Sequence, residues 1–161
     1  MPLTLERHGG SSAYGLAIGL NSLLVVVLQL PLTRLTAGWG PVLPGAALLA
    51  GVGFGLYSVA HSPVPLLLAT CVWTLGEIVG SPAQVDLVIR LSPTHGRGRY
   101  QGINNLSFTL AALASPLVSG WFLDAFGPTA LWTSAAACGA CVALGYRLLQ
   151  RRTGNAAARG N

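Results

Sequence analysis

One long apolar stretch of the chain, WTLGEIVGSPAQVDLVIRL at 73–91, carries three charged side chains and one amide. They are Glu77, Gln84, Asp86 and Arg90. The whole chain has four acidic residues, so half of its carboxylates lie in this one stretch. A carboxylate in apolar surroundings can bind and release protons, contact a polar substrate, or hold two helices together through a buried hydrogen bond. All three roles are open for Glu77.

If this stretch is helical, its polar residues fall into two groups. At 100° per residue Glu77 and Gln84 are about 20° apart, and Ser81 lies on the same side. Asp86 is nine residues beyond Glu77, so it faces the opposite side, and its i, i+4 spacing allows an ion pair with Arg90. We therefore expect Glu77, Ser81 and Gln84 to line a proton or substrate pathway, and we do not expect the two carboxylates to act as an acid/base dyad.

Two amides in another apolar run, Asn21 and Gln29, are further candidates for this pathway because an amide among apolar side chains needs a partner. Either amide can line a cavity or bridge two helices. No His, Cys, Asp and Glu residues have metal-ligand spacing, and no nucleophile has a base beside it. The three cysteines suit the role of small apolar filler. The sequence predicts neither an enzyme nor a bound metal or cofactor.

The composition identifies the elements that must carry these side chains. The chain of 161 residues is 52% hydrophobic and only 8% charged, whereas about a quarter of the residues of a soluble domain are charged. The apolar residues form five runs near bilayer length, which predict membrane-spanning helices. The expected spans are 14–35, 42–60, 64–90, 103–123 and 129–149, separated by turn-forming residues at 38–41, 61–63, 92–96 and 126–128. We therefore expect an all-α, multi-pass membrane protein with one membrane domain over residues 1–161.

The arginines predict the orientation of these spans. Five spans place Arg7 on one side of the membrane and the other eight arginines on the opposite side. The positive-inside rule then puts the N-terminus outside and the C-terminus in the cytoplasm, with the Asp86–Arg90 pair at the cytoplasmic interface. Residues 150–161 are expected to form a disordered basic tail. Because the arginines lie at the ends of spans rather than on an exposed basic domain, nucleic acid is not an expected partner.

Three segments of the chain carry a family resemblance: GEIVGSPAQVDLVIRLSPTHGRGRYQGINNLSF, ASPLVSGWFLDAFGPTALW and YGLAIGLNSLLVVVLQLPLTRL. They resemble transporters of the major facilitator superfamily, most closely their bacterial drug-efflux-like branch. The first segment is similar to the tenth helix, the cytoplasmic loop and the eleventh helix of that family. Its loop contains the RGRYQG-like motif with Arg97, Gly98, Arg99 and Tyr100. ASPLVSGWFLDAFGPTALW resembles the end of the eleventh helix and the turn into the twelfth, and YGLAIGLNSLLVVVLQLPLTRL is similar to the eighth helix.

The resemblance implies helices eight to twelve of a twelve-helix plan, with the N-terminal half of the transporter absent. It implies alternating access, in which two halves rock about a central site, and a cavity-facing position for Glu77. The expected function is small-molecule transport across the plasma membrane as part of a secondary transporter, with proton-coupled efflux as the leading form. The expected partners are the lipid bilayer, a small-molecule substrate, protons and the missing half. The alternative is a truncated, non-transporting fragment or a half-transporter subunit that depends on a partner.

Overall fold

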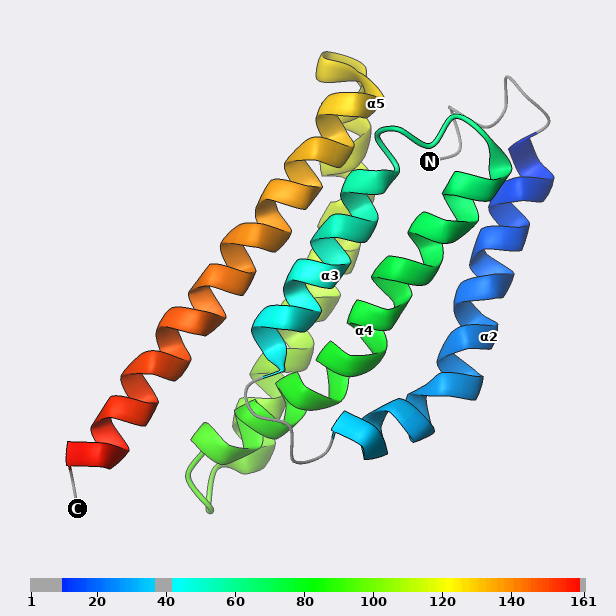
Figure 1. Ribbon diagram of the computed structural model, residues 1–161. Helices are drawn as coiled ribbons and strands as arrows, with labels where there is room; N and C mark the ends of the chain where they lie inside the picture. The colour runs from blue at the N-terminus through cyan, green and yellow to red at the C-terminus, as the bar shows by residue number, and fades with distance from the viewer. Residues whose placement is uncertain (1–9, 37–41, 160–161) are drawn as a thin grey trace.

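A computed structural model describes residues 10–36 and 42–159 of the chain, and the side chains of 15–36 and 42–151. Within those ranges every regular element is a helix (Figure 1). The elements are α2 (Gly10–Thr36), α3 (Leu43–Leu56), α4 (Pro63–Leu91) and α5 (Arg97–Arg159). Three of these helices are long and apolar enough to cross a membrane. The expected all-helical membrane protein is therefore confirmed.

The helix α5 consists of two arms that meet at Gly127. This glycine has φ 79° and ψ 173°, which lie outside the helical range and which a residue with a side chain rarely adopts. Pro128 follows it and suits the first turn of a new helix. Figure 1 shows α5 rising behind α3 as a first arm (97–126), turning over, and descending beside α3 as a second arm (128–159).

The other turns also follow from local chemistry. Ser62 is extended at φ −139° and Pro63 begins α4, while Ser92 ends α4 in an extended conformation. The turn after Ser92 is closed by a hydrogen bond from the Gly96 N–H to the Pro93 carbonyl at 2.9 Å. The predicted breaks at 61–63, 92–96 and 126–128 are thus confirmed. The predicted break at 38–41 falls outside the described residues.

Two boundaries differ from the sequence-based expectation. α3 ends at Leu56 instead of residue 60, because the chain tightens into i to i+3 hydrogen bonds at Tyr57, Ser58 and Val59. Its 14 residues extend about 21 Å, less than the hydrocarbon thickness of a bilayer. Residues 150–159, expected to be a disordered tail, continue α5 as helix, in keeping with the alanine-rich sequence there. The number of spans, the single-domain boundary and the orientation stay predictions.

α3 is the central helix of the bundle. It packs against α4 on one side and against the second arm of α5 on the other, while α2 packs on α4 (Figure 1). The contacts are made through glycine: a Cβ added to Gly53 would lie 2.5 Å from the backbone nitrogen of Trp73 in α4, and one on Gly139 would lie 2.6 Å from the Cα of Gly51. Backbones therefore touch on both sides of α3, as is typical of membrane helices with small residues at their interface.

An aromatic cluster joins the same three elements at the C-terminal end of α3. Phe54 stacks on Trp73 with ring centroids 5.6 Å apart, and Tyr57 packs on Trp132 of the second arm at 4.9 Å. The Trp73 indole Nε1 donates a hydrogen bond of 2.8 Å to the Tyr57 hydroxyl. The glycine contacts and the aromatic cluster together fix α4 and the second arm relative to α3.

Replacing Gly53 by alanine tests the close approach of α3 and α4. The added methyl group would overlap the backbone of Trp73, so we expect Gly53→Ala to lower the free energy of unfolding by about 1–3 kcal/mol. The matched control is Gly19→Ala in α2, where an added Cβ meets no atom within 4 Å. Thermal unfolding of both variants in the same detergent measures the difference. Equal stability of the two variants would contradict the packing described here.

Candidate functional site

One face of α4 carries five polar side chains at alternating spacings of four and three residues. We call this face the polar stripe; it consists of Thr70, Thr74, Glu77, Ser81 and Gln84. At 100° per residue these positions stay within about 40° of one line along the helix. The stripe includes the three α4 residues that helical phase assigns to a pathway, and it extends two turns further toward the start of the helix.

The beginning of the stripe is closed. Thr70 and Thr74 are 1% and 0% exposed, and each hydroxyl donates to a carbonyl of its own helix, Thr70 to Leu66 at 2.9 Å and Thr74 to Thr70 at 2.7 Å. A hydroxyl has one proton to donate, so Thr70 accepts the 2.8 Å hydrogen bond that joins it to Tyr57, and Tyr57 donates it. The buried polar atoms here are satisfied within α3 and α4.

Asn21 of α2 joins the closed part of the stripe to Glu77. Its Nδ2 donates to the Thr74 hydroxyl at 3.0 Å and to the Glu77 carboxylate Oε2 at 3.4 Å. An amide nitrogen has two protons, so both hydrogen bonds form at once, and a carboxylate can only accept. The structure therefore brings together Asn21 and Glu77, two of the residues predicted from sequence, which are 56 positions apart in the chain and lie on different helices.

The stripe becomes open at Glu77. Glu77 and Ser81 are exposed and Gln84 is half-buried, in contrast to the two buried threonines on the preceding turns. Glu77 thus lies at the boundary, held on one side by a neutral amide and accessible on the other. This arrangement can bind a proton or a polar or cationic group at one carboxylate, and it offers a hydroxyl and an amide on the next turns.

The remaining predicted residues lie apart from this site. Gln29 is exposed on α2, eight residues from Asn21 and so about 80° further around the helix. Arg90 Nε donates to Asp86 Oδ2 at 2.7 Å, the i, i+4 pair that the spacing indicates, with both side chains exposed. The position of this pair at a membrane interface stays a prediction.

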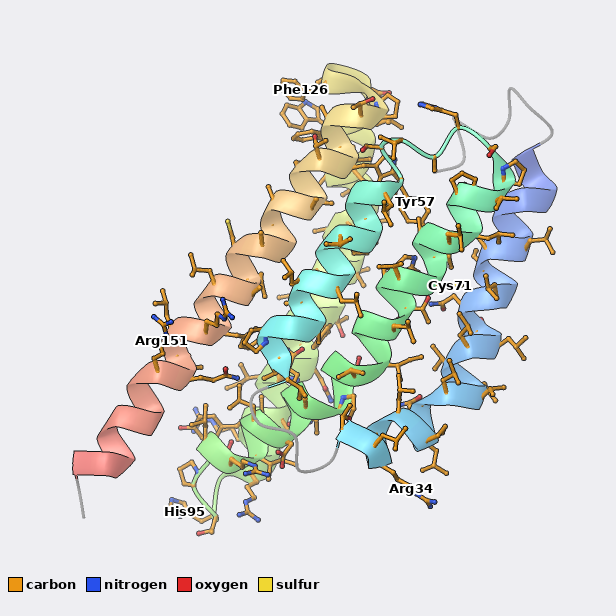
Figure 2. The ribbon with its side chains drawn as sticks, in the orientation of Figure 1. Arg34, Tyr57, Cys71, His95, Phe126 and Arg151 are labelled. Atoms are coloured by element: carbon orange, nitrogen blue, oxygen red, sulfur yellow. The ribbon has the colours of Figure 1, made fainter. Side chains whose placement is uncertain are left out.

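The loop motif lies at the start of α5. Arg97, Gly98, Arg99 and Tyr100 are exposed there, and the backbone N–H groups of Arg99 and Tyr100 donate to the Gly96 carbonyl at 3.0 and 3.2 Å. Figure 2 shows His95, next to this motif, at the same end of the bundle as Arg34 and Arg151, and Tyr57 and Phe126 toward the other end. Among the side chains that the structure describes, no three His, Cys, Asp or Glu residues come close enough to hold a metal ion.

Thr70 and Thr74 are the site residues that sequence reasoning missed. Their signal is the spacing of four, three, four and three residues, which continues the Glu77, Ser81 and Gln84 face backward by two turns. Threonine is common in membrane helices as a residue that bonds its own backbone, so the type of residue alone does not indicate a site. From the sequence, Asn21 of α2 could be identified only as an amide in an apolar run, and its pairing with Thr74 could not be predicted.

Comparison with known proteins agrees with this architecture. The sequence profile of the Major Facilitator Superfamily matches residues 1–160, and the chain therefore belongs to that superfamily. It is 30% identical over 124 residues to the multidrug resistance protein MdtH of Yersinia pestis (strain Pestoides F), and equally to MdtH of Yersinia pseudotuberculosis serotype O:1b (strain IP 31758). These matches cover 76% of this chain and 31% of each relative, so the chain spans about a third of the relatives' length. No solved structure matches the chain.

Replacing Thr74 by valine tests the link between α2 and α4. Valine keeps the shape of threonine but removes the acceptor for Asn21, so we expect a loss of about 0.6 kcal/mol in the free energy of unfolding, the average for a hydrogen bond between membrane helices. The control is Thr109→Val, whose exposed hydroxyl bonds only the Asn105 carbonyl of its own helix. Denaturant unfolding in detergent measures both variants. A larger effect at Thr109 than at Thr74 would contradict the link.

Proposed function

We propose that this chain is part of a secondary transporter that moves a small molecule across the plasma membrane by alternating access, with proton-coupled efflux as its activity. The observation that carries the proposal is the boundary position of Glu77 on the polar stripe. A carboxylate within an apolar membrane helix is costly and marks a substrate or proton pathway. Membership of the superfamily and the name of the relatives, multidrug resistance protein, support transport of a small molecule outward.

The hydrogen bond from Asn21 gives Glu77 a means to couple protonation to helix packing. The ionised carboxylate is a stronger acceptor than the protonated carboxyl group, so the link between α2 and α4 is firmer when the proton is absent. Binding of a proton or of a cationic substrate at Glu77 then changes the same contact. This is the differential interaction that a transporter needs if a ligand is to shift it between two states.

The remaining part of the transport machine is proposed to come from helices outside this chain. The chain covers 31% of the length of its relatives, and α2 and the first arm of α5 leave large apolar side chains such as Val26 and Leu117 80% and 77% exposed. A second transporter half covering part of these faces is our leading interpretation. The same exposed faces favour one second candidate, a partner-dependent subunit or a truncated fragment that does not transport by itself.

Replacing Glu77 by glutamine in the transporter that contains this chain tests the proposed proton site. An amide keeps the size and the polar character of the side chain but binds no proton, so we expect proton-driven efflux of ethidium, a lipophilic cation, to fall by roughly tenfold or more. The matched control is Asp124→Asn, an exposed carboxylate outside the polar stripe. Ethidium fluorescence in inverted vesicles measures efflux, and immunoblotting of the membrane fraction measures insertion. Efflux at the wild-type rate from correctly inserted Glu77→Gln protein would refute the role of Glu77.

The intact mass of the native polypeptide that carries this sequence separates the two candidates. A mass well above 16.6 kDa, together with efflux, supports a transporter of which this chain is one part. A mass of 16.6 kDa with efflux only when a second membrane polypeptide is co-expressed supports the partner-dependent subunit. A mass of 16.6 kDa with no efflux in either case supports the non-transporting fragment and contradicts our first candidate.

A further inference from the structure

A groove of about 660 Å³ opens between the beginning of α3 and the later part of the second arm of α5. Its floor is apolar and includes Pro44, Leu48, Ala143 and Leu144. The polar side chains Arg147, Gln150 and Arg151 lie at one end of the groove. The groove follows from the antiparallel course of the two helices: they touch at Gly51 and Gly139, and they part toward the beginning of α3. Its lining residues come from α3 and α5, whereas the polar stripe lies on α4 and is joined to α2, so the groove is separate from the proposed transport pathway. Figure 1 shows α3 between α4 and the second arm of α5.

The charges at the groove are of one sign. Arg147 and Arg151 are spaced i, i+4 on α5, are both exposed, and form no ion pair with a carboxylate among the described side chains. No carboxylate lines the groove. The described carboxylates are all elsewhere: Glu77 on the polar stripe, Asp86 in its pair with Arg90, and Asp124 near Gly127. Figure 2 shows Arg151 toward the end of the bundle where Arg34 and His95 also lie.

The apolar floor and the two guanidinium groups at one end indicate what kind of molecule the groove can bind. A guanidinium binds phosphate oxygens through paired hydrogen bonds, whereas the floor offers only contacts to hydrocarbon. A free phosphate ion would satisfy the arginines and leave the floor uncovered, and a neutral lipid would cover the floor without meeting the charge. A molecule with an acyl chain below an anionic phosphate headgroup meets both.

We propose that this groove binds one anionic phospholipid, with its phosphate between Arg147 and Arg151 and an acyl chain along the apolar floor. The bound lipid contacts α3 and the second arm of α5 together, at the level where these helices no longer touch. It therefore braces the bundle at its basic end, and it does so independently of whether the chain takes part in transport.

The test measures lipid bound to the purified native polypeptide that carries this sequence. Native mass spectrometry follows exchange into detergent containing phosphatidylglycerol and phosphatidylcholine with identical acyl chains. We expect wild-type protein to retain one phosphatidylglycerol in preference to phosphatidylcholine. In R147Q/R151Q this preference should fall roughly tenfold, because each arginine near an anionic headgroup contributes several-fold to the affinity. The control R97Q/R99Q removes two exposed arginines from the same end of the bundle, outside the groove, and should keep the preference.

A third variant, Gly45→Phe, tests the contribution of the apolar groove while the two arginines stay in place. Gly45 lines the groove, and an added Cβ there meets no atom within 4 Å, so phenylalanine can fill the groove while both arginines remain. We expect this variant also to lose bound phosphatidylglycerol. Three results would overturn the proposal: equal losses in R147Q/R151Q and R97Q/R99Q, full retention in Gly45→Phe, or displacement of the lipid from wild-type protein by millimolar inorganic phosphate, which would show that the arginines bind phosphate without using the groove.

Discussion

The close approach of α3 to its two neighbours is the constraint on which the rest of the fold depends. In a bilayer the lipid chains are as apolar as leucine, so burial of apolar area does not drive helices together and van der Waals contact must do so. Such contact requires backbones to meet, and Gly53 beside Trp73 and Gly51 beside Gly139 allow this on both sides of α3. Away from the Gly51–Gly139 contact, toward the beginning of α3, the second arm of α5 separates from α3. The groove beside Arg147 opens there.

α4 is held in two different ways on its two sides. Toward α3 it is fixed by backbone contact at Gly76, where an added Cβ would lie 2.7 Å from the Ala46 carbonyl, and by the aromatic cluster. Toward α2 its polar contacts are the hydrogen bonds of Asn21, which involve one hydroxyl and one ionisable group. Steric contacts of the first kind do not respond to pH or ligand, whereas the second kind does. The joint between α2 and α4 therefore carries the one ionisable group among these contacts, and the proposed effect of protonation on packing rests on it.

Much of this structure follows from patterns in the sequence, and the exceptions have physical reasons. Length and apolarity define the helices, Gly127 and Pro128 define the turn within α5, and helical phase separates Glu77 from the Asp86–Arg90 pair. The early end of α3 does not follow, because apolar residues continue past Leu56 while the backbone tightens. Residues 150–159 were expected to be disordered although they are helical, because their charge and composition are compatible with both helix and coil. Asn21 could be named as a candidate, but its pairing with Thr74 depends on how α2 crosses α4, which no single-helix pattern contains.

The half-open polar stripe also limits how this chain can exist in a membrane. Thr70 and Thr74 are satisfied inside the bundle, whereas Glu77 and Ser81 face outward beside one amide. In contact with lipid, an ionised Glu77 would cost several kcal/mol, and even the neutral form would leave donors and acceptors without partners. Water or further protein must therefore cover this face for it to be stable. A water-filled cavity closed by additional helices would satisfy this requirement, and the proposed transport pathway needs such a cavity as well.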